Sequence, residues 1–341
     1  MPFHHFRENR VVGVILGKDP AVNHTDWDIA EKLLKGLFGY PFGRFIFLIG
    51  CDIVGSILRV YLTMTTTTIS QMRALLHLLC AEESRTNTEL VRQRLIELGT
   101  DCVPFLEEAL ERADSPDQGR IESVLQEIRW QGLEARFRLW ARQGGDLEEG
   151  AFLLAGFSYP ALDISQYKGI LDKMAGEVRP RIKSLRRSAE VVKVLTQYLF
   201  HEMGFHGNTV SYYDPDNSYL NQVIDRRVGI PITLSLVMWL LAKRLGLPLV
   251  GVGLPGHFLI RYEGGRNEIY IDTFNRGRVL TKEECTRFIK AAGYRYREEY
   301  FLTTTPPEVL VRMMRNLIFV YNQVKETQRV EWLSRYIEVI L

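Results

Sequence analysis

The chain has 341 residues, of which 43 are basic and 41 acidic, so its formal net charge is +2 with neutral histidines. Apolar residues make up 46% of the chain, which excludes a mainly disordered protein. The nearly balanced charge argues against a nucleic-acid partner held by electrostatic attraction. The four cysteines are scattered and form no metal-ligand pattern or disulfide framework, so we expect a cytoplasmic protein with reduced thiols, no metal and no cofactor.

Residues 1–63 form an atypical N-terminal extension. Its apolar stretch, residues 45–62, is interrupted by Asp52 and Arg59, and a membrane-spanning helix needs about 20 apolar residues, so we expect no membrane partner. A buried or ill-formed segment is one alternative. We favour another, in which translation begins at Met64, because the polar residues after it lead into a helical pattern. The extension is then untranslated or disordered.

Helical patterns fill the region that we predict as the first folded domain, residues 64–185. Leucines recur at a spacing of about 3.6 residues, and Pro104 stands near the start of a helix. We predict a turn-rich break over residues 114–119, then an amphipathic helix from about 121 to 141. The helix pairs resemble HEAT repeats without a fixed period, and an irregular helical domain is the alternative. Basic residues around Pro180 predict a linker or a helix start.

The central region, residues 186–305, has the pattern of a helix followed by antiparallel strands. Residues 231–245 are apolar almost throughout, and Pro231 suits the first helical position. They predict a helix that is buried on nearly all sides. Strand patterns follow at residues 249–254, 257–262 and 268–272.

The last two predicted strands flank Gly264-Gly265, a pair suited to a tight turn. A turn there places Arg261 opposite Glu268 and His257 opposite Asp272, with the apolar side chains on the other face. An imidazole beside a carboxylate is the base-and-orienter half of a nucleophilic triad. Cross-strand His–Asp contacts also occur as simple polar pairs, and both interpretations stay open.

This order of elements resembles the core of the transglutaminase-like superfamily, which includes transglutaminases, peptide hydrolases and papain-related enzymes. The matching residues are 229–235, 245–248, 253–259 and 271–274. Residues 217–227 more narrowly resemble bacterial SirB-type proteins, which join such a core to a tetratricopeptide tail. The resemblance implies an α+β fold with three parts. These are a mainly helical N-terminal region, a papain-like or transglutaminase-like core whose buried helix packs on an antiparallel sheet, and a C-terminal helical pair.

The C-terminal pair is predicted over residues 306–341, after a linker that includes Pro306 and Pro307. Apolar side chains at helical spacing indicate two amphipathic helices, which resemble one tetratricopeptide repeat. One repeat cannot bury its apolar face alone. We therefore expect the pair to pack on the central domain, with its remaining apolar surface open to a partner or to a second copy of the chain.

The resemblance implies catalytic roles for His257 and Asp272, but Pro231 occupies the position of the nucleophilic cysteine. Proline cannot attack a substrate. Ser235 lies on the same helix face about one turn deeper, where we expect it to be buried. Cys285 follows a predicted helix cap at residue 281, and we expect it to pack in the core.

The sequence therefore favours a non-catalytic scaffold, a pseudoenzyme that binds a protein or peptide partner and has a regulatory role. The alternative is a hydrolase or acyltransferase of the transglutaminase or cysteine-protease type, which would use His257 and Asp272 with an unidentified nucleophile. The sequence gives no prediction of the oligomeric state.

Overall fold

The computed structural model describes residues 69–81, 85–265 and 268–341. The expectations for residues 1–63 lie outside this part of the chain. The chain consists of two compact units, Met1–Gln71 and Met72–Leu341. The helices and strands described below belong to the second unit. No helix among the described residues is long and apolar enough to cross a membrane.

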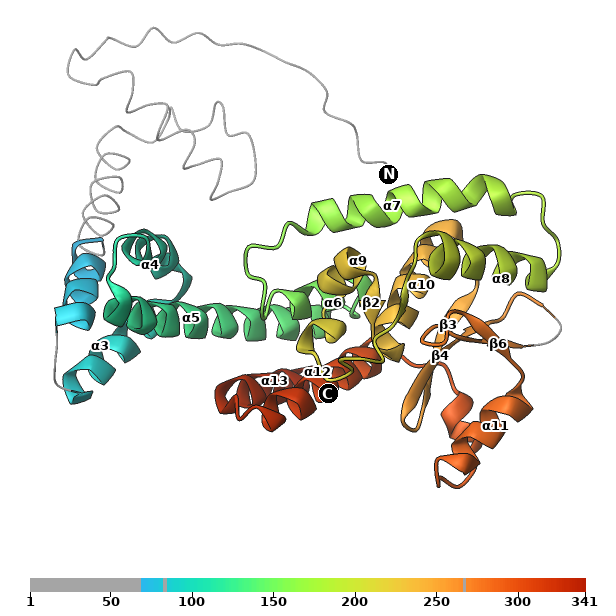
Figure 1. Ribbon diagram of the computed structural model, residues 1–341. Coiled ribbons are helices and arrows are strands. Elements are labelled where there is room, and N and C mark those ends of the chain that lie inside the picture. Colours follow the sequence, from blue (N-terminus) through green and yellow to red (C-terminus); the bar gives the residue numbers. More distant parts are fainter. Residues whose placement is uncertain (1–68, 82–84, 266–267) are drawn as a thin grey trace, which may run out of the picture. The chain divides into compact units, whose positions relative to one another are not determined.

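The N-terminal part of this unit is helical, as predicted (Figure 1). Residues 72–81 are helical and are followed by α3 (Arg85–Leu98), α4 (Val103–Leu110) and α5 (Ser115–Arg142). Their apolar sides form a cluster of their own, with the buried members Met72, Leu79, Leu95, Ile96, Cys102, Leu106, Ile121, Val124, Leu125 and Ile128. Whether these helices are HEAT repeats stays a prediction.

The predicted break over residues 114–119 is wrong, because α5 already begins at Ser115. Asp114 is extended and precedes the helix, and a proline occupies one of the first two helical positions. Proline is favoured there since the N–H that it lacks would have no partner in the helix. The apolar period begins only at Ile121, so sequence patterning detected the helix one and a half turns late.

Three further helical segments lead to the centre: α6 (Leu147–Ala155), α7 (Ile164–Ile182) and α8 (Ser188–Thr196), which continues as the π-helical turn η3 (Gln197–Glu202). The basic run around Pro180 begins in the last turn of α7, with Arg179 and Arg181, and continues through the connection that leads into α8, whose N-cap is Arg187. Arg181 there pairs with Glu202 at 2.7 Å. Basic side chains are favoured at a helix C-terminus because they face its partial negative charge.

The central helix α10 (Pro231–Leu245) has the predicted bounds and is buried over most of its length. Gly246 ends it with a φ of 69°, a conformation that glycine adopts without steric cost. The helix packs between α7 on one side and strands β3 and β4 on the other (Figure 1). Before it come the 3₁₀ turn η4 (Pro215–Ser218), α9 (Leu220–Arg226) and a short parallel pair, β1 (His206–Gly207) with β2 (Val228–Gly229).

The main sheet is antiparallel, in the order β3 (Leu249–Leu254), β4 (His257–Tyr262), β5 (Ile269–Asp272) and β6 (Arg278–Leu280). One face joins the core around α10 through Phe258, Ile260 and Ile271. The other face packs Leu259 and Tyr270 against α11 (Lys282–Ala291) and η5 (Glu298–Phe301). Thr281 caps α11, as the sequence predicted.

The register of the β4–β5 hairpin differs from the predicted one by two residues. Ile260 lies opposite Ile271, and Tyr262 lies opposite Ile269. The pairing therefore ends at Tyr262 and Ile269, and the N–H of Glu263 donates to Pro248 O at 2.9 Å. Side chains alternate along a strand, so a shift of two residues leaves every side chain on its predicted face.

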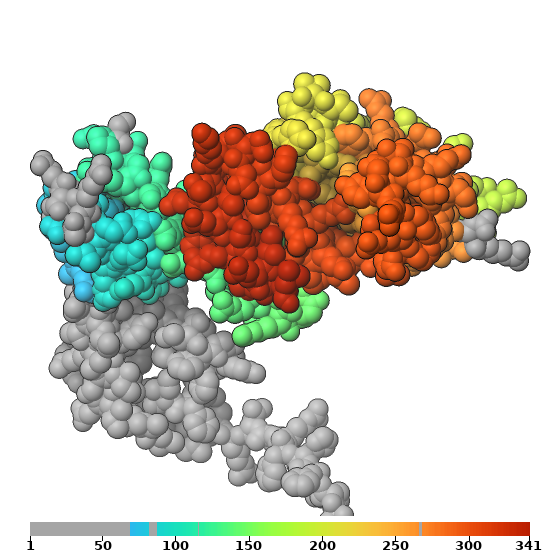
Figure 2. All heavy atoms as spheres, turned by 90° about the horizontal axis from the view of Figure 1, so that it is seen from below, coloured from blue at the N-terminus to red at the C-terminus, as the bar shows by residue number. Residues whose placement is uncertain are grey.

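The C-terminal pair, α12 (Pro306–Gln323) and α13 (Thr327–Ile340), packs on the central domain through α12, as expected, and also on the N-terminal helical region. Helix α12 contacts α6, α10 and η4, and α13 contacts α5. In the view of Figure 2 these red helices adjoin the orange region that contains the sheet and α11. The residues predicted as a linker are not one, because Pro306 starts α12 and the N–H of Thr304 donates to Gly251 O at 2.9 Å.

The predicted α+β fold is thus confirmed: a mainly helical N-terminal region, a buried helix on an antiparallel sheet and a C-terminal helical pair. The domain boundaries at residues 186 and 306 stay predictions. The apolar core around α10 extends from Trp130 to Ile340 and includes residues of both terminal segments.

Candidate functional site

His257 and Asp272 meet at one end of the sheet, where β4 begins and β5 ends. The Nε2 atom of His257 lies 3.0 Å from Oδ1 of Asp272. The observed register places Leu259, not His257, directly opposite Asp272, so the contact is diagonal. A side chain as long as histidine reaches a diagonal neighbour. The predicted pair is therefore formed, although by a different register.

The Asp272 carboxylate is held by a second residue that the sequence analysis missed. Asn275 donates its Nδ2 to Oδ2 at 2.7 Å and its backbone N–H to Oδ1 at 3.2 Å. Burial by itself raises the pKa of Asp272, but the hydrogen bonds from His257 and Asn275 outweigh it and leave that pKa below its ordinary value of 3.8. An Asp followed three residues later by an Asn at a strand end is a local turn pattern that could have revealed this contact.

The pair is covered by α11. His257 and Asp272 project to the same face as Leu259 and Tyr270, which is the face away from the core around α10. The His257 ring centroid lies 5.3 Å from that of Phe288 on α11. Only 11% of the His257 side chain and 8% of the Asp272 side chain are exposed. The pair is thus nearly closed to solvent.

The first turn of α10 lies at the same end of the sheet. Thr273, which follows the pair's aspartate, donates its hydroxyl to Pro231 O at 3.3 Å and lies 2.9 Å from the Ser235 hydroxyl. The hydroxyl of Thr233 donates to Asn217 O at 2.7 Å and accepts from the N–H of Ile230. The hydroxyl groups of Thr233 and Ser235 are thus both hydrogen-bonded to other residues of the chain, and both residues are buried, as expected for Ser235.

Cys285 lies in the core, as expected. Its side chain is fully buried on α11, and burial, with a smaller effect of Glu284 and Asp272, raises the pKa of its thiol to about 12. The thiol is therefore protonated at neutral pH. Among the residues that the structure describes, no serine, threonine or cysteine side chain forms a hydrogen bond with the His257 ring.

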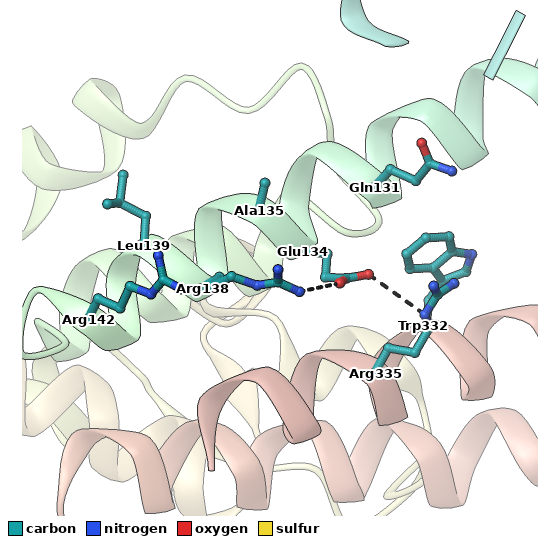
Figure 3. A pocket seen from close by; sticks show the side chains of 8 residues that line it. All are labelled: Gln131, Glu134, Ala135, Arg138, Leu139, Arg142, Trp332 and Arg335. Atoms are coloured by element: carbon teal, nitrogen blue, oxygen red, sulfur yellow. Dashed lines mark hydrogen bonds and ion pairs between the residues drawn. The ribbon is translucent and has the colours of Figure 1, made fainter. Parts of the chain in front are cut away.

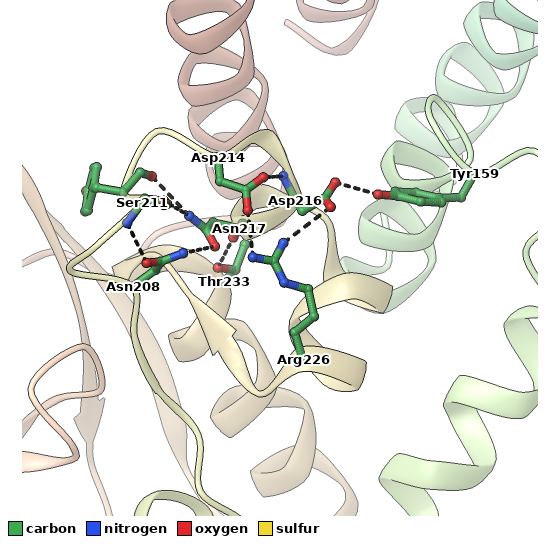
Figure 4. A network of polar contacts seen from close by, with 9 residues as sticks. Tyr159, Asn208, Ser211, Asp214, Asp216, Asn217, Arg226 and Thr233 are labelled. Carbon is green, nitrogen blue, oxygen red and sulfur yellow. Dashed lines mark hydrogen bonds and ion pairs between the residues drawn. The ribbon is translucent and has the colours of Figure 1, made fainter.

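A polar network anchors the loop that precedes α10 (Figure 4). Asn217 accepts from Asn208 Nδ2 at 3.1 Å and donates its own Nδ2 to Ser211 O at 2.8 Å. Arg226 binds Asp214 at 2.6 Å on the same loop. Across the described ranges, no group of three or more His, Cys, Asp or Glu side chains is arranged to hold a metal ion. Asn217 also accepts from the Thr233 hydroxyl of α10 through its backbone O. The network therefore positions the first turn of α10 and the loop beside it.

Arg312 on α12 is a further residue that the sequence analysis missed, and no pattern in the sequence marks it. Its Nη2 donates to Leu254 O and His257 O, both at 2.7 Å, so it clamps the turn between β3 and β4. Its Cζ lies 5.6 Å from the Phe258 ring centroid. Burial lowers the pKa of Arg312, and the Tyr212 hydroxyl opposes that effect. No described carboxylate forms an ion pair with it.

A pocket of about 380 Å³ lies elsewhere, between α5 and α13 (Figure 3). It is lined by Gln131, Glu134, Ala135, Arg138, Leu139, Arg142, Trp332 and Arg335. Glu134 pairs with Arg138 at 2.9 Å and lies 3.7 Å from Arg335. The carboxylate of Glu134 therefore compensates part of the positive charge of the pocket. None of the site residues predicted from the sequence lines this pocket.

Comparison with known proteins places the site in a family context. The model of the transglutaminase-like superfamily matches residues 165–315. The UPF0162 protein of Xylella fastidiosa (strain 9a5c) is 37% identical over 177 residues, which is 50% of this chain and 63% of that protein. F-box only protein 21 of Homo sapiens is 29% identical over 230 residues, which is 58% of this chain and 36% of that protein.

The UPF0162 protein of Vibrio cholerae is 29% identical over 138 residues, which is 40% of this chain and 51% of that protein. The chain thus spans 63% or less of the length of each of these three relatives. No solved structure matches. The matched segment contains α10, the four-stranded sheet and the His257–Asp272 pair. The similarity to the transglutaminase-like superfamily thus covers the part of the chain that contains this pair.

Proposed function

We propose that the chain is a non-catalytic transglutaminase-like scaffold that binds a protein or peptide partner and acts in regulation. The observation that carries this proposal is the surroundings of His257. Asp272 occupies one ring nitrogen, and no described hydroxyl or thiol bonds to the ring. A base without a nucleophile within hydrogen-bond reach lacks the arrangement that covalent catalysis needs.

Three further features support a structural role for the pair. Position 231 is a proline that starts α10, and the neighbouring hydroxyl groups are already bonded. The Asp272 carboxylate accepts three hydrogen bonds in a buried setting. Buried polar groups that are satisfied in this way stabilise one arrangement of the chain. The likeness of residues 217–227 to SirB-type proteins and the helical C-terminal pair favour a protein built for contacts.

A second candidate function rests on one specific observation. The Nε2–Oδ1 distance of 3.0 Å and the lowered pKa of Asp272 are what a base-and-orienter pair requires. A hydrolase or acyltransferase could use this pair if its nucleophile came from outside the described residues.

Chemical labelling separates the two candidates. The full chain is treated under native conditions with iodoacetamide and, separately, with an alkyl fluorophosphonate, and adducts are located by mass spectrometry in wild type and in His257→Ala. Circular dichroism checks that the variant is folded, and unfolded protein is the positive control. We expect the same adducts in both proteins. An adduct that forms on wild type and disappears in His257→Ala would overturn the non-catalytic proposal.

Partner binding is tested in the source organism. Tagged wild type and His257→Ala are expressed at equal levels, crosslinked in cells with formaldehyde, and purified. A tagged version of an unrelated protein of similar size sets the background. We expect the same enriched partner with both chains, since the scaffold does not use the imidazole. The binding half of the proposal fails if neither chain enriches a protein above background.

A further inference from the structure

Four aromatic rings form an exposed chain beside the sheet, which we call the aromatic patch: Tyr212, Tyr213, Phe274 and Phe319. Ring centroids are 5.3 Å apart for Tyr212–Tyr213, 5.8 Å for Tyr212–Phe274 and 5.3 Å for Tyr213–Phe319. Tyr212 is 40% exposed, Tyr213 61% and Phe319 50%. Such clusters on a protein surface mark sites of interaction.

Three separate parts of the fold contribute to the aromatic patch. Its two tyrosines belong to the loop that the polar network holds, Phe274 follows β5, and Phe319 lies on α12. The Phe274 ring packs on the backbone of Gly207, where an added Cβ would lie 2.5 Å from the ring. Rings fixed by different elements lose little conformational freedom when a ligand binds, so the free energy of their contacts is retained.

The Arg312 guanidinium lies next to the aromatic patch. It lies two turns before Phe319 on the same helix, and the nearby Tyr212 hydroxyl raises the pKa of Arg312 against the larger effect of burial. Nη2 is used by Leu254 O and His257 O, whereas Nη1 and Nε form no hydrogen bond with the described residues. A half-buried cation without an anion keeps part of its desolvation cost. A ligand carboxylate at Nη1 would offset that cost.

We propose that the aromatic patch and Arg312 form a docking site for a peptide segment with an acidic residue next to an aromatic or large aliphatic one. The carboxylate binds Nη1 of Arg312, and the apolar side chain covers the rings of Tyr213 and Phe319. A carboxylate fits better than a phosphate group, because Arg312 offers one free donor nitrogen besides Nε and a phosphate needs several. This inference rests on the proposed function and names the chemistry of its partner.

Selection from a random dodecapeptide library displayed on phage tests the site without a known partner. The full chain is the bait, and selected peptides are synthesised with a fluorescent label for anisotropy titration. We expect the selected sequences to share an Asp or Glu next to a Phe, Tyr, Trp, Leu or Ile. Replacing the acidic residue of a selected peptide by its amide should weaken binding at least tenfold.

Variants of the chain locate the bound peptide. Phe319→Ala and Tyr213→Ser alter exposed side chains, so they keep the fold and should each weaken binding at least fivefold. Arg312→Gln should weaken it at least tenfold and abolish the preference for the acidic peptide over its amide. Arg287→Gln changes an exposed arginine on α11 and is the matched control, which should bind as wild type does.

The outcomes distinguish this inference from the proposed function. Acid-containing peptides that depend on Arg312 and Phe319 support both. Peptides that bind all variants equally overturn the docking site and leave a peptide-binding scaffold in place. Selection of no peptide above background, in a chain shown to be folded by circular dichroism, contradicts the docking site; the crosslinking experiment then decides separately whether the scaffold proposal survives.

Discussion

The His257–Asp272 pair and Arg312 lie at one corner of the sheet, where Arg312 donates to the backbone O of His257. The charge of Asp272 has partners within the chain, whereas that of Arg312 has no described counter-ion. In the pair, the carboxylate faces an imidazole and two donors of Asn275 and is nearly closed to solvent. The guanidinium of Arg312 bonds only to carbonyl oxygens and lies beside exposed aromatic rings. The carboxylate of Asp272 is satisfied within the chain, whereas Arg312 keeps donor groups that have no acceptor among the described residues.

The different hydrogen bonding of Asp272 and Arg312 indicates which of the two is the better candidate for ligand binding. A family motif draws attention to His257 and Asp272, but a carboxylate whose hydrogen bonds are all internal has little left for a ligand. A half-buried charge without a counter-ion has the opposite property, because any group that neutralises it gains free energy on binding. The charges and hydrogen bonds therefore favour the surface around Arg312 and the aromatic patch as the ligand site, although the family motif does not include it.

Removal of the Asp272 carboxylate is the strongest test of the closed pair. Asp272→Ala leaves His257 and Asn275 with buried, unpaired donors, and we expect it to lower the free energy of unfolding by about 3–5 kcal/mol. Urea denaturation measures the loss. Glu97→Ala, which breaks an exposed pair with Arg94, is the control and should cost about 0.5 kcal/mol or less.

The double variant His257→Phe/Asp272→Leu sharpens the same test. It replaces the pair by apolar groups of similar size, and buried pairs often tolerate such a change. We expect it to be more stable than Asp272→Ala alone. If Asp272→Ala loses less than about 1 kcal/mol, the pair does not stabilise the fold, and a retained catalytic role becomes the better explanation.

The opposite face of the sheet offers a test of where α10 packs. A Cβ on Gly251 would lie 2.5 Å from the Trp239 ring and 2.7 Å from the Phe258 ring. Gly251→Ala should therefore cost about 1–3 kcal/mol by overpacking. Gly176→Ala, on α7 with no neighbouring atom within 4 Å of the new Cβ, should stabilise the protein by about 0.4–1 kcal/mol. Equal effects would contradict the packing of α10 on this face.

Acid should weaken the closed pair in a defined pH range. The folded state lowers the pKa of Asp272, so its contribution is present above the ordinary value of 3.8 and is lost as the pH falls through the lower pKa of the folded state. Urea titrations of wild type and Asp272→Asn from pH 7 to pH 2.5 measure it. We expect the gap that is present at pH 5 to close as the pH falls towards 2.5. A gap independent of pH would mean that the carboxylate is not preferentially charged in the folded protein.

The aromatic patch should matter least for stability. Phe319→Ala removes a half-exposed ring and should change the free energy of unfolding by less than about 1 kcal/mol. Leu317→Ala, two residues earlier on the same helix and fully buried, is the matched comparison and should cost about 2–5 kcal/mol. Thermal and urea unfolding check both. A large loss with Phe319→Ala would make that ring part of the core instead of a docking surface.

Much of the fold was accessible from local patterns. The bounds of α10 and of strands β3 and β4 agree with the prediction, because Pro231 and Gly246 delimit the helix and alternation delimits the strands. The predicted element bounds were wrong where a residue type, such as proline, occurs both in breaks and in the first turn of helices. Prolines at 116 and 306 were taken as breaks or linkers, although each lies in the first turn of a helix.

By itself, the sequence determined the elements, the faces of the sheet and the meeting of His257 with Asp272, because these depend on periodicities of 3.6 and 2 residues that are local in the chain. The cover of that pair by α11 and the hydrogen-bond partner of the Ser235 hydroxyl follow only from the tertiary structure. It also decided that Arg312 and the aromatic patch come together from the loop before α10, the turn after β5 and α12. Local periodicity does not encode the contacts of the aromatic patch, because they join residues that are far apart in the chain, such as Tyr213 and Phe319, through the packing of the whole core.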